Sequence, residues 1–400
     1  MNDYKVEQKI LKNKGFIIFV GFLSAFVPMS TDLYLPALPS MINEFHTNVQ
    51  ILNLTITFFF LFYAISMLFW GPLSDKHGRR KILSIGMILY TIGSFLCFFA
   101  KTVDFLIIAR ILQAIGSGSA VAVSTAMMKD VFVGKKLVAM LATVQSIAMT
   151  TPVIAPIIGS FILEFTSWHG IFLVLTIVGI IAVIGSLLLT ETLLEFNTGN
   201  LLSVFSNIIT VGKNPRFSSL LVVFSINSMP MMAYITMSSY IYINGFKLSD
   251  QVYSLFYSCT GLFLVIGPLL YIKLSKKFKD YGIITTCFII VIISGILLQV
   301  VGFRNQYTFI LTLIPAMLFG NMLRPPGTNL MLLQQDHNIG SASSLISFAS
   351  TIMGSIGMFV ITFNFGNKIV DIGFMYLVVS VISLVLWLIV TKTHFVKLSK

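Results

Sequence analysis

The sequence predicts an all-α membrane protein with twelve transmembrane helices, and three observations support that prediction. Hydrophobic residues make up 56% of the 400 residues and charged residues only 10%, with a mean hydropathy of +0.94. A water-soluble chain of this length needs far more charge to cover its surface, so the apolar excess must face lipid. The apolar residues also form blocks of about 20, the length of helix that crosses a bilayer. These blocks lack the alternation of barrel strands, which leaves the helix as the spanning structure.

The hydropathy pattern divides into twelve spans. The first apolar block is not followed by a small-residue cleavage pattern, so no removable signal peptide is expected. We place the spans at residues 16–38, 50–70, 82–100, 105–128, 138–163, 170–190, 217–243, 251–272, 281–303, 307–333, 340–365 and 372–391.

The basic residues indicate the orientation of these spans. The net charge is +12, and with a cytoplasmic N-terminus twenty Lys and Arg residues fall on the cytoplasmic side. Only four fall on the opposite side, namely Lys101, Lys247, Arg304 and Lys368. This asymmetry follows the positive-inside rule and places both termini in the cytoplasm. Membrane topology therefore explains the excess of basic over acidic residues, and no nucleic-acid partner is expected.

A polar stretch near the midpoint predicts two domains. Residues 191–215 are the longest polar segment, with six spans before them and six after. We therefore expect six-helix bundles at 1–190 and 216–400 joined by a cytoplasmic linker at 191–215. The three cysteines are odd in number and lie within separate spans, so neither a disulfide nor a metal site is expected.

The loop between spans two and three carries a dense motif, Gly71-Pro72-Leu73-Ser74-Asp75-Lys76-His77-Gly78-Arg79-Arg80-Lys81. Gly71 would permit a close helix approach, and Gly78 would permit a tight turn. Asp75 can pair with Arg79 or favour a neighbouring helix N-terminus. A generic basic cytoplasmic loop would explain the cations but not the placement of the glycines and the aspartate.

This loop resembles the signature G-x-L-x-D-[RK]-x-G-R-[RK] of the major facilitator superfamily. Span four carries Arg110, Gln113, Gly116 and Gly118 in the order RxxQxxGxG, which is similar to a second motif of that superfamily. Span five carries Pro152 and then Ala155-Pro156-Ile157-Ile158-Gly159-Ser160, similar to the antiporter motif GPxxGG with Ala and Ser at its ends. Together with the run from Thr31 to Pro39, these motifs resemble the bicyclomycin- and chloramphenicol-resistance (Bcr/CflA) drug/proton antiporters.

The resemblance implies a fold and an activity. The fold would be two six-helix bundles around a cavity that opens alternately to the two sides of a bacterial inner membrane. The activity would be proton-coupled export of small amphiphilic drugs or metabolites by a monomer that needs no cofactor. In such proteins the loop between spans two and three acts as a latch, which holds the two bundles together on the cytoplasmic side. The resemblance assigns this role to Gly71, Asp75, Gly78 and Arg79. The helix-bending motif maps onto Pro152, Pro156 and Gly159.

Charged residues inside the spans are the candidates for chemistry. Asp32 is the only acidic residue within a predicted span, about 9 Å below its outer end at the rise of a helix, and Arg110 is about 8 Å deep. Asp32 can carry the coupled proton with Arg110 beside it, or the two can form a structural ion pair. Arg324 precedes Pro325 and Pro326, so it can bind carbonyls freed by the prolines or contact an anion or substrate.

Polar residues and methionines in the corresponding spans are candidates for a substrate cavity, although packing is the better explanation for each of them taken singly. They are Met29, Tyr34, Gln113, Asn227, Met231, Tyr234, Asn321 and Arg324. The sequence has no clustered catalytic groups and no phosphate-binding loop, which argues against an enzyme and a primary pump. An importer of a nutrient on the same fold and a non-transporting membrane sensor remain as alternatives.

Overall fold

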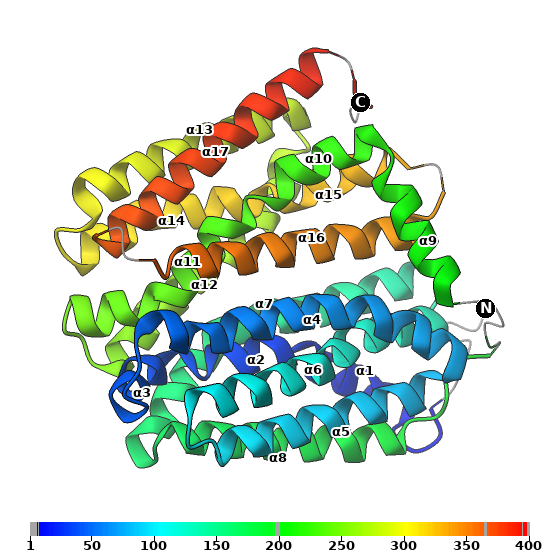
Figure 1. The fold of residues 1–400 in the computed structure, drawn as a ribbon. Coiled ribbons are helices and arrows are strands. Elements are labelled where there is room, and N and C mark those ends of the chain that lie inside the picture. Colours follow the sequence, from blue (N-terminus) through cyan, green and yellow to red (C-terminus); the bar gives the residue numbers. More distant parts are fainter. Residues whose placement is uncertain are drawn as a thin grey trace. The chain divides into compact units, whose positions relative to one another are not determined.

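The computed structural model describes residues 6, 8–194, 196, 201–335, 337–363, 366–393 and 395–397, and its regular elements are helices (Figure 1). Twelve helices in the described part of the chain are long and apolar enough to cross a membrane. Each predicted span overlaps one of them, so the predicted fold class is confirmed. The chain forms two compact units, residues 1–201 and residues 202–400.

The first unit contains six spans. The first span is broken into short elements, and the other five are single helices. In chain order the elements are α1 (Lys12–Ser24), α2 (Phe26–Asp32), η1 (Leu35–Ala37), α3 (Leu38–Glu44), α4 (Val49–His77), α5 (Arg79–Phe98), α6 (Val103–Val131), α7 (Gly134–Phe165) and α8 (Trp168–Leu188).

Glycines let α5 and α6 pack closely in this unit. A Cβ atom at Gly93 would collide with the backbone of Gln113, and one at Gly116 would collide with the backbone of Tyr90. Small residues at such crossings allow backbones to approach and gain dispersion contacts that lipid cannot supply. The close packing surrounds α6 with neighbouring helices, and the candidate Arg110 lies in the first third of this helix.

The second unit also contains six spans. Its first and third spans end in π-helical turns, and its fourth is divided at Leu323. The elements are α10 (Pro215–Ser225), α11 (Ser228–Ser239), η2 (Tyr240–Gly245), α12 (Asp250–Leu274), α13 (Asp280–Leu297), η3 (Leu298–Gly302), α14 (Gln306–Met322), α15 (Arg324–Leu332), α16 (Ile339–Val360) and α17 (Lys368–Lys392).

The predicted linker contains a helix that the sequence analysis missed. Helix α9 (Leu201–Gly212) lies within the polar stretch 191–215, of which residues 195 and 197–200 fall outside the described chain. Leu201, Leu202, Phe205, Ile208 and Ile209 recur at helical spacing between polar residues, which is the pattern of an amphipathic helix. The polar residues at the two ends of the stretch concealed this pattern.

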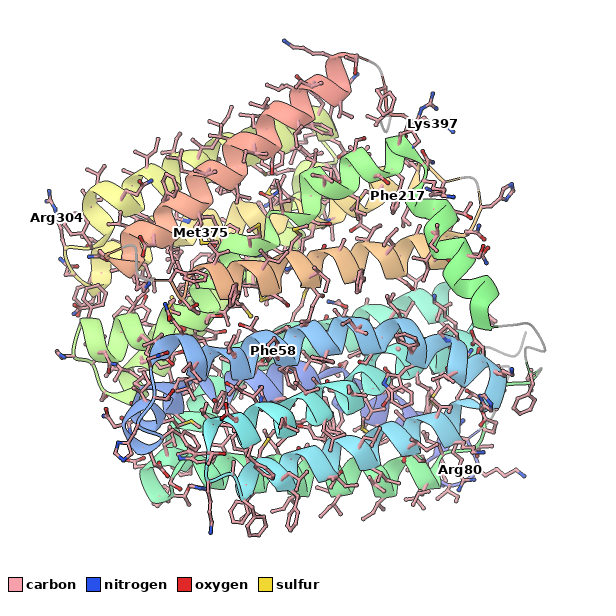
Figure 2. All side chains as sticks on the ribbon, viewed as in Figure 1. Phe58, Arg80, Phe217, Arg304, Met375 and Lys397 are labelled. Atoms are coloured by element: carbon pink, nitrogen blue, oxygen red, sulfur yellow. The ribbon has the colours of Figure 1, made fainter. Side chains whose placement is uncertain are left out.

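Figure 2 places Arg304 and Lys397 at opposite ends of the second unit. The charge count assigns these two residues to opposite sides of the membrane. The long axis of the unit is therefore compatible with the predicted topology, in which both termini are cytoplasmic. That orientation remains a prediction.

Candidate functional site

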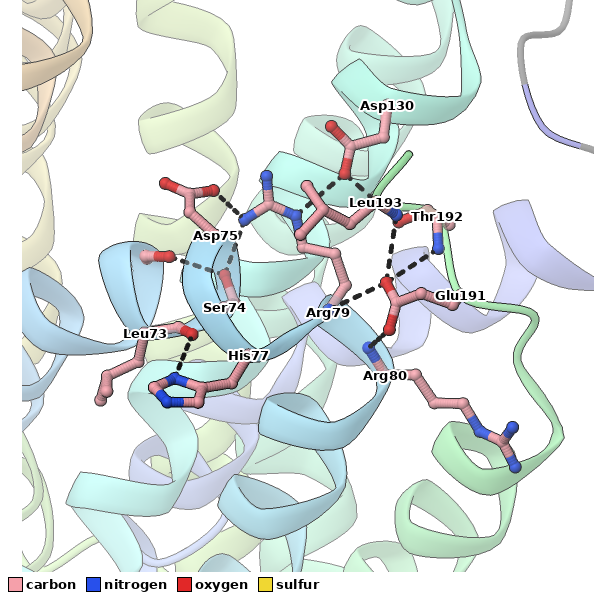
Figure 3. Close-up of polar contacts among 11 residues, drawn as sticks. Leu73, Ser74, Asp75, His77, Arg79, Arg80, Asp130, Glu191, Thr192 and Leu193 are labelled. Atoms are coloured by element: carbon pink, nitrogen blue, oxygen red, sulfur yellow. Dashed lines mark hydrogen bonds and ion pairs between the residues drawn. The ribbon is translucent and has the colours of Figure 1, made fainter. Parts of the chain in front are cut away.

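The loop between α4 and α5 builds a polar network around Arg79 (Figure 3). Gly78 has a φ of 95°, a backbone conformation that glycine adopts readily, and it ends α4 where α5 begins. The turn brings the Arg79 guanidinium against the Asp75 carboxylate, so the predicted pair is confirmed. Arg79 also donates to Ser74 Oγ at 2.7 Å and to Asp130 Oδ2 at 2.9 Å. Because Arg79 is only 6% exposed, these partners stabilise a largely buried charge.

A carboxylate from the segment after α8 binds the N-terminus of α5. Glu191 accepts hydrogen bonds from the backbone N–H groups of Arg79, at 2.9 Å, and Arg80, at 3.1 Å. A carboxylate at this position satisfies free amide groups and interacts favourably with the helix dipole. Asp75 was a candidate for binding a helix N-terminus, but the carboxylate that binds the N-terminus of α5 is that of Glu191. Thr192 links the two carboxylates by donating to Asp130 Oδ2 at 3.3 Å.

The expectation of a close helix approach at Gly71 is wrong for the described residues. A Cβ atom built there would meet no atom within 4 Å. Within the first unit the motif forms the turn at Gly78 and the contacts of its charged side chains. Asp130 and Glu191 were missed by the sequence analysis, since only their position beside the end of a span distinguished them.

Arg110 lies in the interior of the first unit, with no exposed surface. Its Nη1 atom donates to the Ser30 carbonyl at 2.9 Å and to Gln113 Oε1 at 2.5 Å. The guanidinium carbon lies 4.3 Å from the Phe59 ring centroid and 5.3 Å from that of Tyr34. Aromatic faces attract a cation, so these rings partly replace the water that the charge has lost. Its Nε and Nη2 atoms have no hydrogen-bond partner among the described residues.

Asp32 ends α2 and is 5% exposed. The Thr31 hydroxyl donates to Asp32 Oδ1 at 3.1 Å. The contacts of Arg110 within the described chain go to a carbonyl, an amide oxygen and aromatic rings, and they do not include the Asp32 carboxylate. The two charged residues are instead related through α2, because Arg110 binds the carbonyl of Ser30, two residues before Asp32. The choice between the two roles expected for Asp32, a proton carrier or a partner in a structural ion pair, therefore stays a prediction.

Helix α7 packs against the chain directly after Asp32. A Cβ atom at Gly159 would collide with the carbonyl of Leu33, so the two backbones approach closely at this glycine. Pro152 and Pro156 lie inside α7, which continues as one helix from Gly134 to Phe165. The bend expected at these prolines stays a prediction.

The second unit contains a pocket of about 320 Å³. Four predicted cavity residues line it: Asn227, Met231, Asn321 and Arg324. Arg324 is exposed, and its Nη2 atom donates to the Met231 sulfur at 3.6 Å. The Asn321 amide donates to the Met317 carbonyl at 3.0 Å, and the Asn227 amide donates to Ser383 Oγ at 3.0 Å. These contacts fix the polar groups on the walls of the pocket.

The contact that was expected to hold Arg324 to carbonyls freed by Pro325 and Pro326 is absent from the described structure. Pro325 and Pro326 free the carbonyls four residues earlier, those of Asn321 and Met322. The hydrogen bond that the Arg324 side chain makes in the described structure goes to the Met231 sulfur and to neither of these carbonyls. The guanidinium thus faces the pocket with a sulfur atom as its protein partner.

The other predicted cavity residues lie elsewhere. Tyr34 and Gln113 are completely buried around Arg110, where Tyr34 bonds Thr55 Oγ1 at 3.0 Å and Gln113 donates to Ser94 Oγ at 2.8 Å. Tyr234 stacks against Tyr257 with ring centroids 6.1 Å apart and does not line the pocket. Met29 is half-buried on α2. The candidate cavity residues of the second unit thus line a pocket with the exception of Tyr234, whereas those of the first unit do not line this pocket.

Metal-binding chemistry has no candidate in the described residues. No group of three or more His, Cys, Asp or Glu residues is close enough to hold an ion, and the three cysteines are free.

Comparison with known proteins agrees with this geometry. Residues 20–358 match the family model described as Major Facilitator Superfamily. The uncharacterized MFS-type transporter YdgK of Bacillus subtilis is 27% identical and covers 84% of this chain and 86% of its own. The chloramphenicol resistance protein CraA of Acinetobacter baumannii is 25% identical and covers 74% and 71%. A crystal structure of a D-xylose-proton symporter superposes with a TM-score of 0.72 at 13% identity, covering 92% of this chain and 96% of that one.

The drug-resistance relative confirms the resemblance drawn from the motifs, and the shared fold is that of transporters and not of enzymes. A family model that matches residues 20–358 and the twelve membrane-spanning helices lead to one conclusion: this chain is a multi-pass membrane transporter that belongs to the Major Facilitator Superfamily.

Proposed function

We propose that this chain exports small amphiphilic drugs or metabolites in exchange for protons, by alternating access, as a monomer in a bacterial cytoplasmic membrane. The name of the relative CraA states resistance to chloramphenicol, which supports export as the direction. The single observation that carries the proposal is the buried carboxyl group of Asp32, 5% exposed within a membrane-spanning segment.

Asp32 has the surroundings of a proton carrier. A charge at the centre of a membrane helix costs about 2.5–3.5 kcal/mol on insertion scales, so burial favours the protonated acid. The Thr31 hydroxyl and the nearby positive charge of Arg110 favour the carboxylate. Because these influences oppose each other, a change in exposure or the arrival of a substrate would be enough to bind or release the proton.

The packing of α7 offers a route from the proton to the conformational change. Gly159 of α7 packs against the carbonyl of Leu33, the residue that follows Asp32. Any shift of α2 on protonation would therefore displace α7 at this point. Pro152 and Pro156 remove backbone hydrogen bonds from α7 and would allow the helix to bend in response.

The network around Arg79 would act as the cytoplasmic latch. It ties together the end of α4, the start of α5, the end of α6 and the segment after α8 through Asp75, Asp130 and Glu191. The positive-inside rule puts this end of the unit in the cytoplasm. Holding four segments in one geometry would give the cytoplasmic side a defined closed arrangement.

The test is uphill transport in proteoliposomes with an imposed pH gradient and chloramphenicol as the probe. We expect Asp32→Asn to abolish coupled export, because the amide is nearly isosteric with the protonated acid but binds no proton. Asp104→Asn is the matched control, since Asp104 is an exposed acidic residue in the first turn of α6, and it should retain export.

Full coupled export by Asp32→Asn would show that Asp32 does not carry the proton. Proton-driven uptake of the probe by the unmodified protein would identify an importer. Absence of transport for a panel of amphiphilic drugs would favour a sensor.

A further inference from the structure

The pocket of the second unit presents a cation, and no acidic residue is among the described residues that line it. Arg324 is exposed in the pocket, and none of the pocket's lining residues among those the structure describes is an aspartate or a glutamate. The Met231 sulfur, at 3.6 Å, is the hydrogen-bond acceptor that the described protein provides for this guanidinium. A thioether is a weak acceptor, whereas a guanidinium carries five N–H donors. Most of these donors are therefore available to a ligand.

A cation held this way within a membrane-spanning segment calls for a compensating partner. Charged residues in such segments usually pair with another group or mark a substrate pathway. Arg324 lies in the span Gln306–Leu332, and among the described residues its guanidinium makes no hydrogen bond to a backbone carbonyl. The fork of the guanidinium matches the two oxygens of a carboxylate, and a bidentate pair is both strong and directional.

The remaining walls of the pocket suit an apolar body attached to that acidic group. Phe224, Met232, Met331 and Tyr376 supply aromatic and thioether surface, and the volume of about 320 Å³ is typical of a small-molecule site. Methionines adapt their side chains to ligands of different shape. A flat aromatic ring with an acidic substituent would fill both the polar and the apolar parts of the pocket.

We propose that this pocket binds amphiphilic organic acids or zwitterions, with Arg324 pairing with the carboxylate of the ligand. The inference rests on the proposed transport function, for which it names a class of substrate. Asn227 and Asn321 supplement the site, because their amide nitrogens bond protein acceptors and their amide oxygens can accept a hydrogen bond from a ligand N–H group. A zwitterion would thus satisfy both kinds of group.

The inference is tested by calorimetric titration of the purified full-length protein in detergent micelles. The probes are 1-naphthoate and its uncharged analogue 1-naphthamide, which share the ring and differ in charge. We expect the unmodified protein to bind naphthoate at least tenfold more tightly than naphthamide. Arg324→Gln should remove this preference by weakening naphthoate alone, and Arg324→Lys should retain part of it, since the charge is kept but the fork is lost.

Arg304→Gln is the matched control, because Figure 2 shows Arg304 at the end of the second unit, away from the pocket lining. This variant should bind both probes as the unmodified protein does. Gly320→Leu provides a second test that keeps the charge. Gly320 lines the pocket, and a Cβ atom there meets nothing within 4 Å, so the larger side chain can be accommodated while it occupies ligand space. Binding of both probes should fall at least tenfold.

Equal binding of the two probes by the unmodified protein, or naphthoate binding that survives both Arg324→Gln and Gly320→Leu, would overturn the inference. The proposed function is judged separately by uphill export of chloramphenicol. Normal export together with naphthoate binding that does not depend on Arg324 would reject the acid-binding pocket and leave the exporter standing. Arg324-dependent binding without any coupled export would reject the exporter and retain the pocket.

Discussion

Each of the two units has an arginine in its fourth span, and the two arginines differ in burial and in their contacts. Arg110 in the first unit is fully buried, with Ser30 and Gln113 as acceptors and aromatic rings around it. Arg324 in the second unit is exposed in a pocket and has one sulfur contact. An arginine in the fourth span is thus a packed internal charge in one unit and an accessible ligand group in the other.

The helix packing around each arginine accounts for this difference. A Cβ atom at Gly93 of α5 would collide with the backbone of Gln113, three residues after Arg110. The Phe59 ring of α4 lies 4.3 Å from the guanidinium carbon, so α4 and α5 close around Arg110.

In the second unit, Gly320 faces open space one turn before Arg324, where α14 gives way to α15. Close backbone packing also occurs in the second unit, where a Cβ atom at Gly267 of α12 would collide with the Leu318 carbonyl of α14. The open space at Gly320 is the feature that leaves room for a ligand beside Arg324.

The strongest test of this contrast substitutes one glycine in each unit. Gly116→Ala forces a methyl group into the backbone of Tyr90 and should destabilise the protein by about 3 kcal/mol, at the upper end of the cost of overpacking. Gly320→Ala meets no neighbour and should stabilise α14 by about 0.5–1 kcal/mol, because alanine is the better helix former. Thermal unfolding in detergent measures both. Equal destabilisation by the two substitutions would contradict the contrast.

The two arginines themselves should differ by a smaller margin. Arg110→Ala leaves the buried Gln113 oxygen without its donor and should lower the free energy of unfolding by about 1–3 kcal/mol. Arg324→Ala removes one weak sulfur contact and should change it by no more than about 0.5 kcal/mol, as for a surface substitution. The same unfolding experiment compares them. A larger loss from Arg324→Ala would show that this side chain is structural.

The smallest effect on stability is expected from substitutions in the loop that joins the second and third spans of each unit. The first unit has the network of Asp75, Arg79 and Asp130, whereas in the second unit the Tyr271 hydroxyl donates to Asp280 Oδ1 at 2.8 Å. Asp75 is 41% exposed, so Asp75→Ala should cost less than about 1 kcal/mol of stability.

If the Asp75 network is the latch, Asp75→Ala should nevertheless lower chloramphenicol export about tenfold while ligand binding in detergent stays within twofold. Tyr271→Phe in the matching loop is the control and should reduce export less. Transport and binding assays on the same preparations decide the matter. Parallel loss of binding and transport in Asp75→Ala would assign Asp75 to folding instead.

The sequence by itself determined the features that depend on local properties of the chain. Hydropathy summed over about 20 residues located all twelve spans, because lipid selects apolar segments wherever they occur. Residues four apart on a helix are neighbours, so the pairing of Asp75 with Arg79 could be predicted from spacing. The turn at Gly78 followed from the conformational freedom of glycine.

Tertiary structure alone decided which distant groups meet. Glu191 reaches the start of α5 from 112 residues away, and nothing near it in the sequence indicates that partner. The aromatic rings around Arg110 come from α4, α8 and the turn after α2, whereas Arg324 meets Met231 of α11 at the edge of a pocket. Both arginines look alike in the sequence, since each is a single cation within an apolar segment. Their exposure depends on how closely neighbouring helices pack, and that distance is a property of the folded chain.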